Sequence, residues 1–439
     1  MTFNDLKLSK FLHTALEEQN ITNPTLIQQR AIPAVLSGKD VVGVAQTGTG
    51  KTLAYLLPIL RDLTYSNQRF PRVLILVPTR ELAVQVASEI EKLTTYMSVR
   101  TLAVYGGTNI NTQKKLVHEG SDIIVATPGR LYDLAMTAVL RLKDIQKLVI
   151  DECDEMLNLG FRPQLERIFD LLPDKRQNLL FSATLTEDVS KIIDQFLTNY
   201  EHVVAAPTGT PLEQIEQKAY NAPNFYTKLN FLKHLIETDA SFTKIFIFVK
   251  SKSLADRIHD ALEETFPEQF GVIHSNKSQN YRLRVVESVR NEEIRGIVAT
   301  DLVARGIDID YVSHVINFDI PEQPEQYMHR IGRTGRVDQK GEAITFVSEK
   351  EAVYFHGIQK YMRLEVATQE LPEEVEISEE LIPEEEEQNI HDAPTIVANP
   401  TPPRSQKDEK SSKIDKTRRN IKPKERAQAK KRRNRRKKR

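Results

Sequence analysis

Short runs of apolar residues alternate with amphipathic segments between about residues 41 and 350. Within each run successive positions are apolar, which is typical of parallel strands that helices cover on both faces. A stretch at 206–211 with two prolines and one glycine separates the runs into two sets. We expect strands at 41–44, 73–77, 122–126, 147–150 and 178–181, and then at 245–249, 271–273, 296–299, 314–318 and 343–346. This pattern predicts an α/β protein with two doubly wound parallel sheets and ligands at the carboxyl ends of the strands.

The apolar pattern stops after about residue 368. Residues 370–387 hold ten acidic side chains and no lysine or arginine, and a proline-rich stretch follows. Residues 404–439 contain 19 lysines and arginines against 4 acidic residues, a net charge of +15, so the rest of the chain carries −15. Such segments bury too little apolar surface to fold. We therefore expect an acidic and proline-rich disordered segment at 368–403 and a basic tail at 404–439.

The separation of charge bears on the partner of this chain. A concentrated basic tail beside an acidic body indicates a polyanion, with nucleic acid as the first candidate. The alternative is a tail that only keeps the protein in solution, although acidic residues serve that purpose better than arginines. We expect the tail to bind RNA.

Composition also limits the cellular setting. No apolar run approaches the ~20 residues of a membrane span, so we expect no membrane partner. The first residues lack the basic and apolar regions of a secretory signal. Cys153 is the only cysteine, which excludes an internal disulfide. These features predict a protein of the reducing cytoplasm.

A glycine-rich loop follows the first predicted strand. It reads Ala45-Gln46-Thr47-Gly48-Thr49-Gly50-Lys51-Thr52 and leads into an amphipathic segment. A strand, a glycine loop and a helix together aim backbone N–H groups at phosphates, while a lysine reaches the terminal phosphates and a threonine hydroxyl suits Mg²⁺. The P-loop pattern asks for glycine where this chain has Ala45, so the loop alone could be a chance glycine turn.

Paired carboxylates follow the predicted strand at 147–150. The sequence there is Asp151-Glu152-Cys153-Asp154. One carboxylate at a strand end suits a metal ion, and a second suits the activation of water. Taken alone, the residues could form a solvated acidic turn. Together with the glycine loop they predict an enzyme that hydrolyses a nucleoside triphosphate.

Further motifs occur in a fixed order along the chain. They are Pro78-Thr79-Arg80-Glu81-Leu82, Thr127-Pro128-Gly129-Arg130, Ser182-Ala183-Thr184, the segment from Ala299 to Asp308, and the segment from His329 to Arg336. As a set, over residues 3 to about 350, they resemble the DEAD-box RNA helicases of superfamily 2. The resemblance implies two tandem RecA-like domains, at 1–207 and 215–367, joined by a linker at 208–214.

The resemblance also implies an ATP site. Phe3 would stack on adenine and Gln28 would read its edge, although Phe3 could instead pack against the first helix. Thr52 and Asp151 would hold Mg²⁺, and Glu152 would act as general base. The remaining nucleotide contacts would come from Ala45, Gln46, Thr47, Gly48, Thr49, Gly50, Lys51, Ser182, Thr184 and His329. Lys51 would also act in catalysis, as would Arg333 and Arg336 as arginine fingers and Asp308 in positioning the water.

The same resemblance implies RNA contacts from both domains. Backbone N–H groups, hydroxyls and a few charged side chains would bind phosphates without reading bases, so little sequence specificity is expected. The implied residues are Pro78, Thr79, Arg80, Gly106, Gly107, Thr127, Gly129, Arg130, Gln279, Arg282 and Thr300.

Two departures from the family pattern are informative. Cys153 replaces alanine, and we expect a buried packing residue rather than a reactive thiol. Asn20 replaces a glycine, and asparagine tolerates the left-handed cap of a helix nearly as well. Neither change removes a catalytic group.

The expected function is an RNA-dependent ATPase that locally unwinds short duplexes. The acidic and basic tail looks like that of bacterial helicases of ribosome assembly or cold adaptation, so ribosomal precursors or RNA-degrading machinery are expected partners. An ATP-gated RNA clamp shares every motif and remains an alternative. A passive RNA-annealing chaperone is a third, against which Glu152, Arg333 and Arg336 argue.

Overall fold

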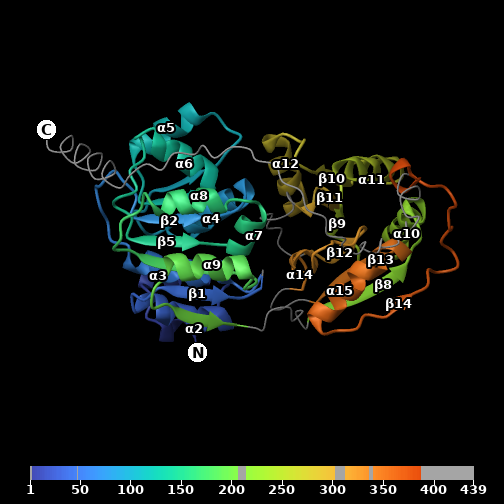
Figure 1. Ribbon diagram of the computed structural model, residues 1–439, viewed down its shortest axis with the longest axis horizontal. Helices are drawn as coiled ribbons and strands as arrows, with labels where there is room; N and C mark the ends of the chain where they lie inside the picture. The colour runs from blue at the N-terminus through green and yellow to red at the C-terminus, as the bar shows by residue number, and fades with distance from the viewer. Residues whose placement is uncertain (1, 47, 206–213, 302–311, 336–339, 387–439) are drawn as a thin grey trace, which may run out of the picture. The chain divides into compact units, whose positions relative to one another are not determined.

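The structure is a computed structural model that describes residues 2–46, 48–205, 214–301, 312–335 and 340–386 (Figure 1). Within these ranges the chain forms two successive α/β domains. The first contains η1 (Phe3–Leu6), α1 (Lys10–Glu18), α2 (Leu26–Leu36), β1 (Val41–Val44), α3 (Lys51–Asp62), β2 (Val73–Leu76), α4 (Arg80–Leu93), β3 (Thr101–Val104), α5 (Ile110–Glu119), β4 (Ile123–Ala126), α6 (Pro128–Met136), β5 (Lys147–Ile150), α7 (Cys153–Asn158), α8 (Arg162–Phe169), β6 (Gln177–Ser182), α9 (Glu187–Phe196) and β7 (Glu201–Val204).

The second domain repeats this alternation of strands and helices. It contains β8 (Ile215–Asn221), α10 (Phe225–Thr238), β9 (Ile245–Val249), α11 (Lys252–Thr265), β10 (Phe270–Ile273), α12 (Gln279–Arg290), β11 (Gly296–Thr300), β12 (His314–Asn317), α14 (Pro324–Ile331), β13 (Gly341–Val347), η2 (Glu349–Glu351), α15 (Ala352–Met362) and β14 (Thr368–Gln369).

The two sheets have the same topology. The first has the order β3-β4-β2-β5-β6-β1-β7 and the second β10-β11-β9-β12-β13-β8-β14, with parallel pairing throughout. Numbered from the start of each domain, the two orders are identical. Two tandem doubly wound parallel sheets are therefore confirmed.

The register places the ends of the central strands side by side. Val44 of β1 pairs with Ser182 of β6, and Ile150 of β5 pairs with Leu180. Leu76 of β2 lies beside Ile150. The loops that follow these strands therefore share the carboxyl edge of the sheet, where open α/β sheets bind ligands.

Alternate strand residues enter different cores, which explains the continuous apolar runs. In β2, Val73 and Ile75 belong to one cluster, whereas Leu74 and Leu76 belong to the cluster on the opposite face. A strand covered on both faces needs an apolar residue at every position. The second sheet is likewise flanked by two clusters.

All ten predicted strands are present, but the sequence analysis missed β3, β7, β8 and β14. Two of these lie at sheet edges and one is a two-residue edge strand. The fourth, β8, is fully buried only at Ile215 and Ala219. Strands with one exposed face do not form continuous apolar runs, so the criterion could not detect them.

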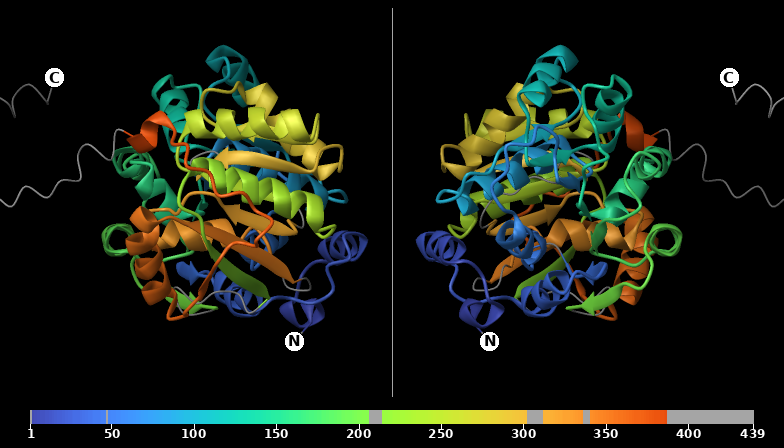
Figure 2. Two further views of the ribbon diagram at one scale, coloured as in Figure 1. Left: turned by 90° about the vertical axis from the view of Figure 1, so that its right-hand side faces the viewer. Right: turned by 90° about the vertical axis from the view of Figure 1, so that its left-hand side faces the viewer.

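The predicted disorder at 368–403 is wrong for its first half. β14 pairs with β8, and Val375 and Ile382 are buried against the second domain. The left view of Figure 2 shows this red segment running alongside the yellow-green helices. The second domain therefore extends beyond residue 367. The predicted linker, apart from Gln214, and residues 387–439 lie outside the described residues.

The structure also bears on the expected helix cap at Asn20 and on membrane-spanning helices. Asn20 adopts φ 57° just after α1, which confirms the left-handed cap. Within the ranges that the structure describes, no helix is both long and apolar enough to cross a bilayer.

Candidate functional site

The glycine loop joins β1 to the first turn of α3. Gly48 and Gly50 have φ values of 78° and 88°, a conformation that residues with a Cβ rarely adopt. Lys51 begins α3, its side chain is buried, and among the described residues no acceptor lies within hydrogen-bond distance of its Nζ. A helix N-terminus with a buried, unpaired ammonium group is suited to bind phosphates. Thr47 lies outside the described residues.

Gln28 contacts the glycine loop directly. Its Nε2 donates to the carbonyl oxygen of Gly50 at 3.1 Å, and its Oε1 accepts from the backbone N–H of Thr25 at 3.0 Å. A Cβ at Gly50 would lie 2.3 Å from Gln28 Nε2, so the close approach requires glycine. The structure therefore places Gln28 at the site. Phe3 is buried in the core with Leu6, which supports its packing role and leaves adenine stacking untested.

The acidic loop after β5 carries the paired carboxylates. Asp151 Oδ1 accepts from the backbone N–H of Glu152 at 2.9 Å, and Asp151 Oδ2 accepts from the Tyr55 hydroxyl at 2.8 Å. Glu152 has φ 50° and ψ 52°, a left-handed conformation that costs a non-glycine residue about 1–2 kcal/mol. Such strain is concentrated at functional sites.

The third carboxylate, Asp154, joins the acidic loop to the end of β6. Its Oδ2 accepts from the Thr184 hydroxyl at 2.8 Å and from the Thr184 backbone N–H at 2.9 Å. Ser182 Oγ accepts from the Asp154 backbone N–H at 3.3 Å and donates to the Thr184 carbonyl oxygen at 2.8 Å. The motif at 182–184 is thus hydrogen bonded to the acidic loop rather than free to contact a ligand.

The second domain brings a histidine and an arginine to these carboxylates. His329 Nε2 lies 3.8 Å from Asp154 Oδ2, and His329 Nδ1 lies 4.0 Å from Glu155 Oε2. The charge of Arg333 opposes the rise in the pKa of Glu152 that burial causes. The other two predicted groups of this domain, Asp308 and Arg336, lie outside the described residues.

Burial and charge separate the pKa values of the three carboxyl groups. Burial raises the pKa of Asp151 and of Glu152 above their ordinary values, although Lys51 and, for Glu152, Arg333 oppose it. Burial acts on Asp154 as well, but His329, Lys51 and the Thr184 hydroxyl outweigh it and lower the pKa of Asp154. A carboxylate whose pKa is raised toward neutrality is a better proton acceptor.

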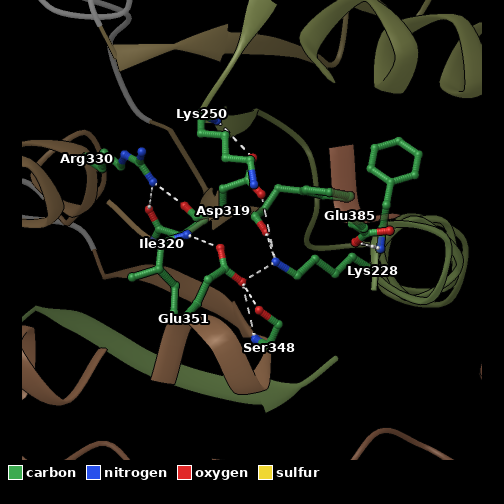
Figure 3. A network of polar contacts seen from close by, with 11 residues as sticks. Lys228, Lys250, Asp319, Ile320, Arg330, Ser348, Glu351 and Glu385 are labelled. Atoms are coloured by element: carbon green, nitrogen blue, oxygen red, sulfur yellow. Dashed lines mark hydrogen bonds and ion pairs between the residues drawn. The ribbon is translucent and has the colours of Figure 1, made fainter. Parts of the chain in front are cut away.

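A buried polar network supports the helix that carries His329 (Figure 3). Arg330 is 1% exposed and donates through Nε and Nη2 to Asp301 at 2.6 and 2.7 Å. Its Nη1 donates to the Asp319 carbonyl oxygen at 2.6 Å. Lys228 Nζ donates to Glu351 at 2.6 Å and to the Phe318 carbonyl oxygen at 2.9 Å. Breaking a buried pair of this kind costs about 3–5 kcal/mol, so α14 is firmly held.

Several of the predicted RNA-binding residues contact one another or adjacent residues in the loops at the carboxyl edge of the first sheet. A Cβ at Gly107 would overlap the Arg80 guanidinium, so this side chain passes directly over the backbone at 106–107. Arg130 Nη2 donates to the Thr108 carbonyl oxygen at 2.9 Å. A Cβ at Gly129 would meet no atom within 4 Å, which leaves the start of α6 open.

Thr79 and Thr127, two of the predicted RNA-binding residues, differ in how their hydroxyls are hydrogen bonded. Thr79 Oγ1 accepts from the Leu82 backbone N–H at 3.3 Å and so caps α4, which Pro78 precedes. Thr127 precedes α6 at the corresponding position, but its side chain makes no capping bond. The Thr127 hydroxyl is therefore the freer of the two for a phosphate.

In the second domain, the predicted RNA residues Gln279 and Arg282 contact Glu81 of the first. Gln279 Nε2 donates to Glu81 Oε1 at 3.1 Å, and Arg282 Nη1 lies 3.2 Å from the same oxygen. Sequence reasoning missed Glu81 as a partner, because its place in the motif at 78–82 does not show that it faces a residue 198 positions away.

Thr300 lines a pocket of about 660 Å³ at the carboxyl edge of the second sheet. The other lining residues are Asn158, Leu159, Lys250, Ser251, Lys252, Ser275, Asp301, Gln323 and Gln326. The sequence analysis also missed the two lysines, although a basic pair directly after the strand at 245–249 is a usable signal for phosphate binding.

Cys153 is the first residue of α7, is fully buried and packs in the core. Burial is the main reason that the pKa of its thiol is raised well above the ordinary value, and the charge of Asp154 contributes to the rise. Reactive thiols need a lowered pKa and exposure. The expectation of a packing residue is therefore supported.

Comparisons with known proteins cover both domains. Residues 25–192 match the DEAD/DEAH box helicase model, and residues 227–338 match the helicase conserved C-terminal domain. The chain is 38% identical over 371 residues to the DEAD-box ATP-dependent RNA helicase CshA of Bacillus cereus, covering 84% of this chain and 70% of that protein. It is 37% identical over 373 residues to the ATP-dependent RNA helicase DeaD of Buchnera aphidicola, covering 85% of this chain and 61% of that protein.

Solved structures agree with this assignment. Saccharomyces cerevisiae Dbp5 bound to RNA and ADP BeF3 matches with a TM-score of 0.77 and 29% identity, over 84% of this chain and 95% of that one. Mss116p bound to ssRNA and AMP-PNP matches with a TM-score of 0.77 and 28% identity, over 85% and 80%. Since family models, curated relatives and solved structures all extend across both domains, the chain belongs to the DEAD-box family of ATP-dependent RNA helicases.

Proposed function

We propose that RNA binding stimulates this helicase to hydrolyse ATP with Mg²⁺, and that it uses the cycle to open short RNA duplexes locally. One observation carries the proposal. His329 of the second domain lies 3.8 Å from Asp154 and 4.0 Å from Glu155, beside the acidic loop of the first domain. The second domain therefore reaches the loop that carries Glu152, as expected if hydrolysis depends on how the two domains meet.

The residues present fit Mg²⁺. Thr52, in the first turn of α3, supplies a hydroxyl, and Asp151, directly after β5, supplies a carboxylate. Mg²⁺ is usually held by one or two carboxylates together with substrate phosphates and water. When bound, the ion would neutralise charge on the phosphates.

Residues of the chain would bind the nucleotide, accept the proton of water and stabilise the developing charge. The loop at 45–52 and Lys51 would bind the phosphates, and Gln28 would bind adenine while it keeps contact with Gly50. Glu152 would take the proton of the attacking water. Arg333 would stabilise the charge that develops on the transferred phosphoryl group, together with Arg336.

RNA would bind along the carboxyl edges of both sheets. Arg80, Gly107 and Thr127 offer a guanidinium, a backbone and a hydroxyl, none of which distinguishes bases. Gln279 and Arg282 would contribute from the second domain, where they already contact Glu81 at the end of the same set of loops. We therefore expect weak sequence specificity.

The basic segment at 404–439 supports a further RNA contact outside the two domains. We propose ribosomal precursors or RNA-degrading assemblies as the setting in which the helicase acts. Cosedimentation with such particles, compared between the full chain and a chain that ends at residue 403, tests this. Equal cosedimentation of the two chains would argue against a role for the tail.

A strand-displacement assay tests the central proposal. We expect the wild type to separate a short RNA duplex with a single-stranded extension only when ATP is present, and Glu152→Gln to bind RNA without multiple turnover. ATP hydrolysis stimulated by RNA but with no displacement would instead support an ATP-gated clamp. Strand exchange that does not depend on ATP would support a passive annealing chaperone.

A further inference from the structure

Tyr55 hydrogen bonds to Asp151, one of the two residues proposed to hold Mg²⁺. It lies one turn after Thr52, the other of the two, in α3, and its side chain is completely buried. The Tyr55 hydroxyl donates to Asp151 Oδ2 at 2.8 Å. Residues three apart lie on one face of a helix, so Thr52 and Tyr55 face the same side of α3.

The direction of this bond follows from the donors available. An ionised carboxylate only accepts, so the Tyr55 proton points to Asp151. Removal of the hydroxyl would therefore leave Asp151 Oδ2 without this donor.

Packing fixes the position of this phenol. The Tyr55 ring lies 5.4 Å from the ring of Phe181, at an interplanar angle of 52°. The Phe181 ring covers Gly43 of β1 so closely that a Cβ there would lie 2.5 Å from it. Both rings belong to one buried cluster. The hydroxyl therefore has little freedom to turn away from Asp151.

We propose that Tyr55 is a positioning residue for Mg²⁺, which orients the Asp151 carboxylate so that it can ligate the ion. The second Asp151 oxygen is already held by the Glu152 backbone N–H at 2.9 Å, so Tyr55 completes the fixation of this carboxylate. Groups that orient metal ligands in this way affect metal affinity strongly. The inference rests on the proposed function, because it takes Thr52 and Asp151 as the ligands.

The test removes one oxygen atom. Full-length wild type and Tyr55→Phe are titrated with a fluorescent ATP analogue in EDTA and at graded Mg²⁺ concentrations. We expect the Mg²⁺ concentration for half-maximal enhancement of binding to rise about tenfold in Tyr55→Phe. Binding in EDTA should stay within about twofold, because phosphates and adenine contact other residues.

Tyr327→Phe is the matched control. Tyr327 is also completely buried, and its hydroxyl bonds to Gln217 at 3.0 Å, far along the chain from the glycine loop. This variant should keep the wild-type Mg²⁺ dependence. A second arm places Tyr55→Phe in an Asp151→Asn background, where the hydroxyl should have a much smaller effect on Mg²⁺ dependence.

The outcomes distinguish a failure of the proposed metal site from a failure of the proposed role of Tyr55. Wild-type binding that does not depend on Mg²⁺ would contradict the proposed metal site itself. A Mg²⁺-dependent wild type with an unchanged Tyr55→Phe would overturn the role of Tyr55. Equal loss of binding with and without Mg²⁺ would also overturn it, since that result would show a general packing defect.

Discussion

Glu152 combines a strained backbone with a buried carboxylate. Its left-handed conformation and its raised pKa arise from the same tight turn between β5 and α7. A strained residue persists only where its surroundings hold it, here through the bond from its N–H to Asp151. The strain therefore fixes the direction of the side chain at the residue where we propose proton transfer.

Glu152→Gln should reduce ATP turnover by about 10³-fold, because the amide keeps the shape of the side chain and cannot accept the proton of water. Affinity for ATP and ATP-dependent RNA binding should persist. Phosphate release in single-turnover and steady-state experiments measures the change. Near wild-type turnover would show that the base lies elsewhere.

Arg333→Ala should lower kcat by about 10³-fold if this arginine stabilises the transferred phosphoryl group. Affinity for ATP should change far less, since the glycine loop belongs to the other domain. Arg363→Ala, which removes an exposed arginine of the same domain, serves as the control and should leave kcat unchanged. Loss of ATP affinity at unchanged kcat would assign Arg333 a ground-state role.

The opposite edge of the first sheet carries a stabilising cluster around Asp122. Its Oδ1 accepts from Arg72 at 2.9 Å, and its Oδ2 accepts from Arg100 Nε at 3.0 Å. Burial tends to raise the pKa of Asp122, but the hydrogen bonds from Arg100 and Arg72 outweigh it and lower the pKa below 3.8. Because the folded pKa is lowered, the contribution of Asp122 to stability is full above the unfolded value and lost as pH falls through the folded value.

Asp122→Asn should lower the free energy of unfolding by about 3 kcal/mol at neutral pH, because Arg72 is left buried and unpaired. The difference from wild type should shrink as pH falls below about 4. Urea unfolding followed by circular dichroism measures it, since the chain has no tryptophan. A difference that does not vary between pH 7 and pH 3 would rule out this linkage.

At the scale of elements, the acidic segment at 370–386 behaves as part of the second domain. Asn224 Nδ2 donates to the Ser378 carbonyl oxygen at 2.5 Å, and Glu385 accepts from the Phe225 backbone N–H at 2.8 Å. The segment is therefore bonded to the start of α10, the helix that also carries Lys228 of the buried network. Most of its carboxylates are exposed, whereas Val375 and Ile382 are buried in the core.

Ile382→Ala should lower the free energy of unfolding by about 2 kcal/mol and expose the segment to protease, because Ile382 is 3% exposed. The matched control is Ile377→Ala in the same segment, where the side chain is 64% exposed. That change should cost less than about 0.5 kcal/mol. Equal effects of the two substitutions would show that the segment is not docked.

At the scale of the whole molecule, the main feature is the separation of charge. Residues 404–439 carry +15 and the remainder −15, so the net charge of zero describes neither part. A polycation attached to helicase domains raises the local concentration of RNA without sequence selection.

Removal of residues 404–439 should weaken RNA binding and leave ATP hydrolysis in the absence of RNA unchanged. For single strands, the slope of log affinity against log salt should become shallower by roughly 0.7 per lost phosphate contact. Titrations of single-stranded RNA at several salt concentrations measure it. An unchanged slope would show that the tail does not contact RNA.

The sequence by itself determined the fold class and proposed the candidate residues of the site. Strands covered on both faces are continuously apolar, so ten of them could be predicted, and several of the motifs could be placed at strand ends. The edge strand Thr101–Val104 is fully buried only at Val104, and the strand Ile215–Asn221 only at Ile215 and Ala219, so local apolar content did not reveal them. The ordered structure of 370–386 was not predicted, because the few apolar residues that pack against the domain stand among many carboxylates in the sequence.

Only the tertiary structure decided which of these residues act on one another. Tyr55 and Asp151 are 96 positions apart, and Glu81 and Gln279 are 198 apart, yet each pair is hydrogen bonded. Such contacts depend on strand order and helix packing, which local periodicity does not encode. The left-handed conformation of Glu152 likewise arises from the bonds around it and not from its residue type. Patterns along the chain report how each segment is buried, whereas the chemistry of the site depends on distances between segments, and those exist only in the folded molecule.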